Sequence, residues 1–160
     1  MEAPSALQGL RVLDLSDNKG QYCAKLIADM GADVIKIEPP GGDEARRIGP
    51  FYHDEEELEK SLYWFMLNTS KRGITLDITT ARGAELFRRL VAEADFVVES
   101  FVPGTLEHHG LGYASLTEIR PDLIMASISN YGQSGPYRDY VATDLDLLGM
   151  SGTLFLCGDP

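Results

Sequence analysis

The sequence has few of the features that mark membrane, secreted or nucleic-acid-binding proteins. No apolar run approaches the roughly 20 residues of a membrane span, and the start, MEAPSALQGL, lacks the basic and long apolar regions of a secretion signal. Lysine and arginine number 14 against 25 aspartates and glutamates, and the net charge of −11 opposes binding to nucleic acids and anionic membranes. Two distant cysteines, Cys23 and Cys157, favour reduced thiols in the cytoplasm, with a disulfide between them as the alternative.

Glycine is scarce at the position where a dinucleotide-binding fold needs it. Such a fold places several glycines between its first strand and helix, so that the backbone can approach a pyrophosphate. Here the corresponding turn, Ser16–Gln21, has a single glycine, and its Asp17 would repel a phosphate. Glu38 does match the ribose-binding acid expected about 20 residues further on. One matching position does not replace the missing glycines, so the sequence disfavours NAD. Phosphate-loop and serine-hydrolase motifs are also absent.

Short apolar runs alternate with helical patterns along the chain. Five runs rich in Val, Ile or Leu predict strands buried on both faces, at Arg11–Ser16, Asp33–Glu38, Gly73–Ile78, Phe96–Ser100 and Leu123–Ser129. Helices are predicted between and after them, at Gln21–Met30, Ser61–Leu67, Thr80–Ala94, Leu116–Arg120 and Asp144–Leu148. This alternation predicts an α/β fold with a Rossmann-like, mostly parallel sheet and helices on both of its faces.

Loops rich in Gly and Pro follow two of the predicted strands. Phe101–Thr105 follows the fourth strand, and Ser129–Pro136 follows the fifth. In open α/β sheets, ligands bind outside the carboxyl ends of the strands. Together with the first turn, Asp17–Gly20, these loops therefore predict a binding crevice at that edge of the sheet.

Other charged and imidazole side chains have two interpretations each. Lys71 and Arg72 precede a predicted strand, either as binding cations or as solvated charges paired with the acidic segment His53–Lys60. His108 and His109 are adjacent, so they face different ways on a helix, and no cluster of Cys or carboxylates joins them. We therefore expect no metal site.

The last residues predict a turn. The apolar segment Thr153–Leu156 is followed by Cys157 and a Gly-Asp-Pro turn signal that ends at Pro160. A turn leads into further structure, so we expect a longer protein of which these residues are a part. The alternative is a flexible C-terminus.

Several separate blocks of the sequence resemble one protein family. These blocks are LQGLRVLDLS, GADVIKIEPPGGD, NTSKRGITLDI, ADFVVESFVPGTLEHHGLGY, ISNYGQSGPY and TDLDLLGMSG. In this order they are similar to the family III CoA-transferases, also called the CaiB/BaiF family. The resemblance runs from Leu7 to about Gly152, and it implies that residues 1–160 are the N-terminal part of the Rossmann-like large domain. It also implies that the small domain and a returning C-terminal segment lie downstream, and that complete chains form an interlocked homodimer.

The resemblance implies a reaction as well. Family members move CoA from an acyl-CoA to a carboxylic acid through aspartyl anhydride and aspartyl-CoA intermediates. Their nucleophilic Asp aligns beyond Pro160, and Asp159 is interpreted as part of the hairpin turn. Racemases of 2-methylacyl-CoA share the fold, but they carry an acid/base His where Thr143 stands, which disfavours racemisation. A third possibility is a non-catalytic half-domain that pairs with another chain.

The resemblance further implies roles for individual residues. Asp144 aligns with an acidic residue that supports catalysis, although it could equally cap the last helix, and Asn18 aligns near a Gln that contacts acyl groups. The expected CoA contacts are Leu76 and Thr79 against the adenine, together with Ser100, Phe101 and the position of His108. Relatives often carry a basic residue at four positions occupied here by Pro39, Thr79, His108 and Val141. Compensating cations for the CoA phosphates are expected from Lys71, Arg72, Arg46 and Arg47.

Overall fold

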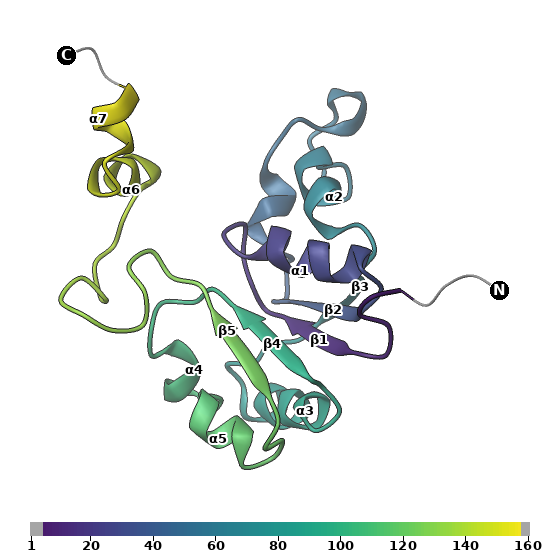
Figure 1. Ribbon diagram of the computed structural model, residues 1–160. Helices are drawn as coiled ribbons and strands as arrows, with labels where there is room; N and C mark the ends of the chain where they lie inside the picture. Colours follow the sequence, from purple (N-terminus) through teal and green to yellow (C-terminus); the bar gives the residue numbers. More distant parts are fainter. Residues whose placement is uncertain (1–4, 158–160) are drawn as a thin grey trace.

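A computed structural model describes residues 5–157 and contains a five-stranded sheet (Figure 1). All of its paired strands are parallel, in the order β3-β2-β1-β4-β5. The strands are β1 (Arg11–Asp14), β2 (Asp33–Glu38), β3 (Arg72–Thr75), β4 (Phe96–Glu99) and β5 (Ile124–Ser127). The chain moves outward from β1 to β3 and then returns to the other side of β1 for β4. The neighbours β1 and β4 therefore form the switch point beside which α/β proteins bind ligands.

Helices connect the strands and cover both faces of the sheet (Figure 1). They are α1 (Gln21–Asp29), α2 (Leu62–Asn68), α3 (Ala81–Val91), α4 (Thr105–His108), α5 (Tyr113–Thr117), α6 (Asp144–Met150) and α7 (Thr153–Cys157). Two short 3-10 helices, η1 (Glu44–Arg47) and η2 (Tyr52–Asp54), follow β2. Side-chain oxygens cap two of the longer helices, since Ser61 accepts from Trp64 N and Thr80 accepts from Gly83 N.

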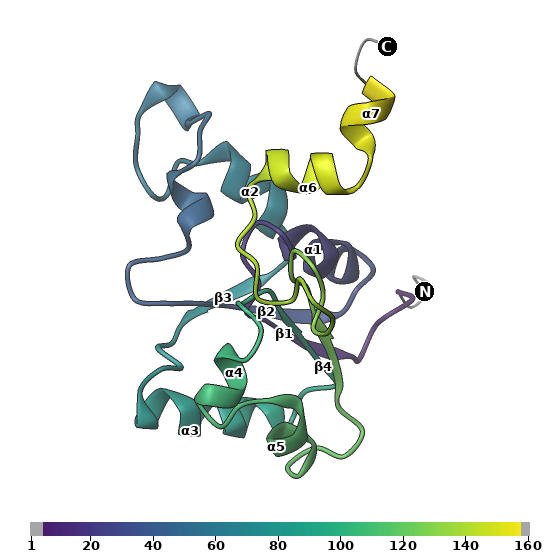
Figure 2. The same cartoon turned by 90° about the vertical axis from the view of Figure 1, so that its left-hand side faces the viewer.

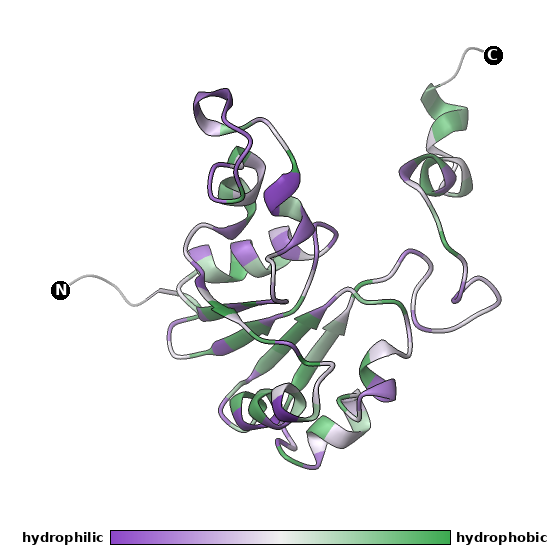
Figure 3. Ribbon diagram, turned by 180° about the vertical axis from the view of Figure 1, so that it is seen from behind, coloured by the Kyte–Doolittle hydropathy of each residue, from purple (hydrophilic) through white to green (hydrophobic). Residues whose placement is uncertain are grey.

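Alternate residues of the central strands feed two separate cores. Val12, Val34 and Val98 point to one face, where they pack against Ala24 and Ala28 of α1. Their neighbours point to the other face and pack against α3, α4 and α5, and this larger core includes Leu13, Ile35, Val97, Phe87 and Leu116. The strands are accordingly mostly green, the colour of apolar residues, in Figure 3. The predicted fold class, a parallel α/β sheet with helices on both faces, is confirmed.

Three local predictions were wrong in ways that the sheet and its loops explain. The strands after α2 and α5 were expected to be buried, but β3 and β5 are the two edges of the sheet, and Ile124 of β5 is 54% exposed. The helix expected at Leu116–Arg120 begins earlier, at Tyr113, because Gly112 is extended and starts it. Helix α4 was not expected at all, since its four residues are too few to display a period.

The C-terminal helices stand at the end of a long loop that leads away from the sheet (Figures 1 and 2). Thr143 is the N-cap of helix α6: it accepts a hydrogen bond from Asp146 N while the Asp146 carboxylate accepts from Thr143 N, so Asp144 is the first helical residue and not the cap. The segment Thr153–Leu156, expected to enter a hairpin, is helical. The predicted turn residue Asp159 lies outside the described residues. Within residues 5–157, no helix is long and apolar enough to cross a membrane.

Candidate functional site

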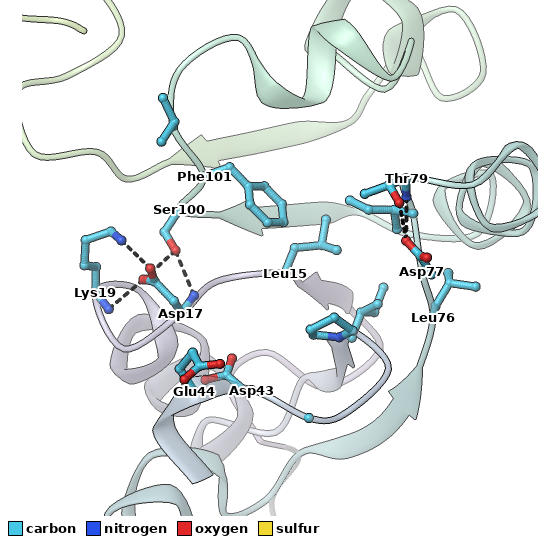
Figure 4. A pocket seen from close by; sticks show the side chains of 15 residues that line it. Leu15, Asp17, Lys19, Asp43, Glu44, Leu76, Asp77, Thr79, Ser100 and Phe101 are labelled. Carbon is cyan, nitrogen blue, oxygen red and sulfur yellow. Dashed lines mark hydrogen bonds and ion pairs between the residues drawn. The ribbon is translucent and has the colours of Figure 1, made fainter. Parts of the chain in front are cut away.

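A crevice of about 420 Å³ opens at the carboxyl edge of the sheet, at the predicted place (Figure 4). The loops that follow β1, β2, β3 and β4 all contribute to it. The lining residues are Leu15, Asp17, Lys19, Ile37, Pro39, Gly42, Asp43, Glu44, Leu76, Asp77, Ile78, Thr79, Ser100, Phe101 and Val102. Four predicted CoA contacts, Leu76, Thr79, Ser100 and Phe101, are thus brought together, although they lie on two different loops of the sequence.

The walls of the crevice are largely apolar. The side chains of Leu15, Leu76 and Phe101 are drawn around the same space in Figure 4, and Phe101 and Leu76 are only partly buried against the larger core. A concave, apolar surface of this size with a few polar groups at its rim suits a flat, weakly polar ring system. Adenine is such a ring system.

At one rim, hydrogen bonds between Asp17 and Ser100 fix the first turn to the end of β4. The carboxylate of Asp17 accepts hydrogen bonds from the Lys19 ammonium and from Ser100 Oγ, the latter at 2.7 Å. Ser100 Oγ in turn accepts from Asp17 N at 2.8 Å. Burial by itself would raise the pKa of Asp17, but the hydrogen bonds from Lys19 and Ser100 outweigh it and lower this pKa below its usual value. Asp17 is therefore a charged, fully engaged structural group at neutral pH.

At the opposite rim, the loop after β3 closes on itself. Thr79 donates to Asp77 Oδ1 through its backbone N–H at 3.0 Å and through its hydroxyl at 2.6 Å, and both hydrogen bonds lower the pKa of Asp77. Because the Asp77 carboxylate holds the turn, Thr79 is presented at the rim with its hydroxyl oxygen still able to accept a hydrogen bond.

A network of buried charges supports the wall formed by Asp43. The Lys36 ammonium lies 3.2 Å from Asp43 Oδ2, and Gln21 Nε2 donates to the same oxygen at 2.9 Å. Glu38 accepts two hydrogen bonds from Arg46, at 2.6 and 2.8 Å, and one from Asp43 N. The carboxylate that resembled a ribose-binding acid is therefore engaged by Arg46, and Arg46 is not available as a cation for phosphate.

Two further cations predicted to bind CoA, Lys71 and Arg72, do not line the crevice either. Lys71 has a side chain only 1% exposed, and its ammonium donates to Asp14 Oδ2, Gln21 O and Asn68 Oδ1 at 2.8 to 3.0 Å. Burial lowers the pKa of Lys71, and the charge of Asp14 offsets only part of that effect. Arg72 pairs with Asp33 at 2.6 Å, where β2 and β3 begin. The crevice lies at the other ends of these strands, their carboxyl ends. The acidic segment expected to pair with these cations engages Lys60 and Arg46 instead.

The remaining predicted site residues are exposed and dispersed. Asn18 lies in the first turn beside the crevice, but it is not among the residues that line it. His108 is at the end of α4 and Asp144 is the first residue of α6, away from the sheet. Among residues 5–157, no group of three His, Cys, Asp or Glu side chains could hold a metal ion. Cys23 and Cys157 are both exposed free thiols.

A second, smaller pocket of about 120 Å³ adjoins the crevice and shares four lining residues with it, namely Lys19, Ser100, Phe101 and Val102. Its other wall comes from Pro103 and from the loop after β5, through Ser129, Asn130, Arg138, Asp139, Tyr140 and Val141. The predicted convergence of the Gly- and Pro-rich loops is thus observed. Sequence reasoning missed Lys19 and Arg138 as members of one pocket: Lys19 lies in a loop that the sequence singled out, whereas Arg138 lies just beyond the loop that ends at Pro136.

Comparisons with known proteins agree with this geometry. Residues 7–160 match the family model described as CoA-transferase family III. Over 158 residues the chain is 42% identical to the succinate–glutarate CoA-transferase of Agrobacterium fabrum, covering 96% of this chain and 40% of that protein. It is 48% identical over 128 residues to the succinyl-CoA:mesaconate CoA-transferase of Haloarcula hispanica, covering 79% of this chain and 32% of that protein.

A solved structure shares the same fold. The crystal structure of a CaiB/BaiF family protein from Brucella suis is 41% identical, with a TM-score of 0.89, and the match covers 99% of this chain and 42% of that one. The chain thus spans about two-fifths of the length of that transferase and of the protein in that structure. The family model, the sequence relatives and the solved structure agree, and the chain belongs to the CoA-transferase family III.

Proposed function

We propose that this chain supplies the CoA-binding part of an enzyme that moves CoA from an acyl-CoA to a carboxylic acid. The observation that carries the proposal is the single apolar crevice into which Leu76, Thr79, Ser100 and Phe101 converge from separate loops. Leu76 and Phe101 provide apolar surface for the adenine, and Thr79 provides a hydrogen-bonding group at the rim. CoA itself enters as part of the substrate, and the reaction as proposed uses no metal.

The attacking carboxylate of the proposed reaction comes from outside residues 5–157. The carboxylates that line the crevice have other partners: Asp17 is held by Lys19 and Ser100, and Asp77 by Thr79. Asp43 accepts from Gln21 and Ala45 N, and Glu44 pairs with Arg47 at 3.1 Å. Removing a carboxylate from such partners in order to acylate it would cost several hydrogen bonds. Asp144, and Asn18 beside the first turn, remain supporting residues in this proposal.

The chemistry of the whole protein then follows in two exchanges. The attacking carboxylate displaces CoA thiolate from the acyl-CoA and forms an acyl–aspartyl anhydride; the thiolate attacks the aspartyl carbonyl, forms aspartyl-CoA and releases the donor acid. The acceptor carboxylate attacks aspartyl-CoA and releases the thiolate, which attacks the new acyl carbonyl and regenerates the aspartate. The anhydrides must be kept from water. We infer that further segments, and a second copy interlocked with the first, enclose the site.

The names of two relatives indicate the class of acid that we propose as the substrate of this chain. Succinate and glutarate, or succinyl-CoA and mesaconate, are named in the two relatives compared above. We propose that this chain also serves dicarboxylic acids. We further propose that it works in the cytoplasm, a reducing compartment that suits its two exposed free cysteines. Racemisation is not favoured, because the Thr143 hydroxyl caps α6 and donates to Asp146 Oδ2 at 2.7 Å.

Calorimetric titration of the chain with CoA tests the proposal, with adenosine as a fragment ligand and NAD as the comparison ligand. We expect saturable binding of CoA and adenosine, and NAD, which contains the same adenosine, should bind no more tightly than adenosine. Phe101→Ala should weaken adenosine binding by about tenfold, since stacking of a base on an aromatic ring is worth about 1–3 kcal/mol. Phe101→Leu keeps most of the apolar packing but removes the aromatic ring, so it should weaken adenosine binding by a similar factor.

Tyr113→Ala provides the matched control, because Tyr113 is an exposed aromatic residue of α5 that does not line the crevice. It should bind adenosine as the wild-type chain does. Equal adenosine affinity of the wild-type, Phe101→Leu and Tyr113→Ala chains would contradict the assignment of the crevice. Binding of NAD alone would restore the dinucleotide-binding alternative.

A further inference from the structure

One carboxylate that lines the crevice, that of Asp77, differs from the others in having no cation paired with it. The other three each form an ion pair: Asp17 with Lys19, Asp43 with Lys36, and Glu44 with Arg47. Within residues 5–157, Asp77 accepts hydrogen bonds only from Thr79 and forms no ion pair. Its negative charge is therefore the least neutralised of the four.

The carboxylate of Asp77 also has an unused oxygen. Both hydrogen bonds from Thr79, at 3.0 and 2.6 Å, go to Oδ1, and Oδ2 accepts none in the part of the chain that the structure describes. These hydrogen bonds hold the pKa of Asp77 below its usual value, with a smaller contribution from the charge of His109. Asp77 is thus ionised at neutral pH and has one oxygen free to accept a hydrogen bond.

The neighbours of Asp77 relate this free oxygen to the sugar of the ligand. Leu76 and Thr79, which we assign to the adenine, lie on either side of Asp77 in the same loop, and all three line the crevice (Figure 4). The ribose is bonded directly to the adenine, so it lies beside the groups that contact the base. A carboxylate beside a ribose accepts a hydrogen bond from a sugar hydroxyl and repels a phosphate there, as in folds that distinguish NAD from NADP.

We propose that Asp77 is a specificity-determining residue of the crevice, which accepts a hydrogen bond from a ribose hydroxyl and disfavours a phosphate on that sugar. The inference rests on the proposed function, because it requires adenosine in the crevice. It goes further in naming the preferred ligand, an adenosine or a CoA derivative whose 3′-hydroxyl is free. CoA carries a phosphate at this position, so the chain should bind 3′-dephospho-CoA more tightly than CoA.

Calorimetric titration with two matched pairs of ligands tests the inference at fixed low ionic strength. The pairs are adenosine with adenosine 3′-monophosphate, and 3′-dephospho-CoA with CoA. We expect the wild type to bind the member without the 3′-phosphate about tenfold more tightly, as Coulomb's law gives for a doubly charged phosphate about 6 Å from one carboxylate in water. Because salt screens this repulsion, the ratio of affinities should fall as the ionic strength rises.

Asp77→Asn removes the charge and keeps a side-chain oxygen that can accept both hydrogen bonds from Thr79, so the rim should stay in place. This substitution should bring the affinities within each pair close to equality. Asp122→Asn is the matched control, because Asp122 is exposed before β5 and does not line the crevice. It should keep the wild-type ratio.

Equal affinities within each pair for the wild type, or a preference that Asp77→Asn leaves intact, overturn the inference. If Asp77→Asn does not fold, the wild type still decides, since a preference that is the same at low and high salt overturns it as well. Adenosine binding that depends on Phe101 would survive either result and keep the proposed function. Absence of adenosine binding to the wild type, by contrast, overturns the proposed function and the inference with it.

Discussion

At the scale of single residues, the cations divide into two groups according to what burial does to them. Lys36, Lys71 and Arg46 each contact a carboxylate of the buried network, where an unpaired charge would be expensive. Lys19 and Arg138 line a cavity wall instead, where each pairs with an aspartate close to it in the sequence, Asp17 and Asp139. The position of a cation in the sequence does not predict its burial. Lys71 is buried, whereas its neighbour Arg72 is exposed.

Glu38 illustrates how such a pair responds to pH. Burial alone would raise its pKa, but the hydrogen bonds from Arg46 and from Asp43 N outweigh it and hold the pKa below 4.5, the ordinary value. The folded protein therefore keeps the carboxylate charged at pH values where the unfolded chain has begun to bind a proton. The stability that Glu38 contributes is complete above pH 4.5 and is lost as the pH falls through the lower folded pKa.

Glu38→Gln should lower the free energy of unfolding by about 3 kcal/mol at pH 7, because it leaves the Arg46 guanidinium without its buried carboxylate. Urea denaturation of both proteins at pH 7 and in steps below pH 4.5 measures the effect. The difference between the proteins should shrink as the pH falls. Glu44→Gln is the control, since the exposed Glu44–Arg47 pair should be worth less than about 1 kcal/mol. A difference that is independent of pH would contradict the role of the Glu38 charge.

At the scale of elements, the first turn of α3 is packed unusually closely against the loop that forms one rim of the crevice. A Cβ atom added to Gly83 would lie 1.7 Å from Asp77 O and 2.9 Å from Thr80 Oγ1. The Thr80 hydroxyl caps the helix by accepting from Gly83 N at 3.0 Å. Because Asp77 and Thr79 line the crevice, any shift that relieves this clash moves the rim as well.

Gly83→Ala should therefore destabilise the chain by about 1–3 kcal/mol, the usual cost of overpacking, and should weaken adenosine binding. Gly149→Ala is the matched substitution, because Gly149 is inside α6 and its added Cβ would meet only Leu154 Cδ1, at 3.7 Å. There the same change should stabilise the chain by about 0.5–1 kcal/mol, through helix propensity. Thermal unfolding and calorimetry of both variants provide the measurements. Equal effects at the two positions would show that the close packing at α3 has no energetic consequence.

At the scale of the whole molecule, the C-terminal helices expose more apolar surface than a monomer usually tolerates. Phe155 is 89% exposed and Leu156 is 81% exposed, and Leu145, Met150 and Val141 are also exposed. Contiguous apolar surface of this kind favours association.

We expect this chain to self-associate at micromolar concentrations, and Phe155→Ser with Leu156→Ser to shift it toward the monomer. Light scattering over a concentration series measures both effects. Tyr113→Ser, which removes an exposed aromatic residue on α5, is the control and should leave association unchanged. A sharp monomer from the wild-type chain would contradict this expectation.

The sequence by itself determined the alternation of strands and helices, the parallel sheet, the crevice edge and the family resemblance, because these depend on local periodicity and on runs of specific residues. It also named Leu76, Thr79, Ser100 and Phe101, which share one cavity. Only the tertiary structure decided which strands are edges and which cations are buried, since both depend on strand order. Lys71 reaches a carboxylate 57 positions away, and Arg138 lines the same pocket as Lys19 although the two are far apart in the sequence. Such pairings arise from packing at long sequence separation, which no local pattern records.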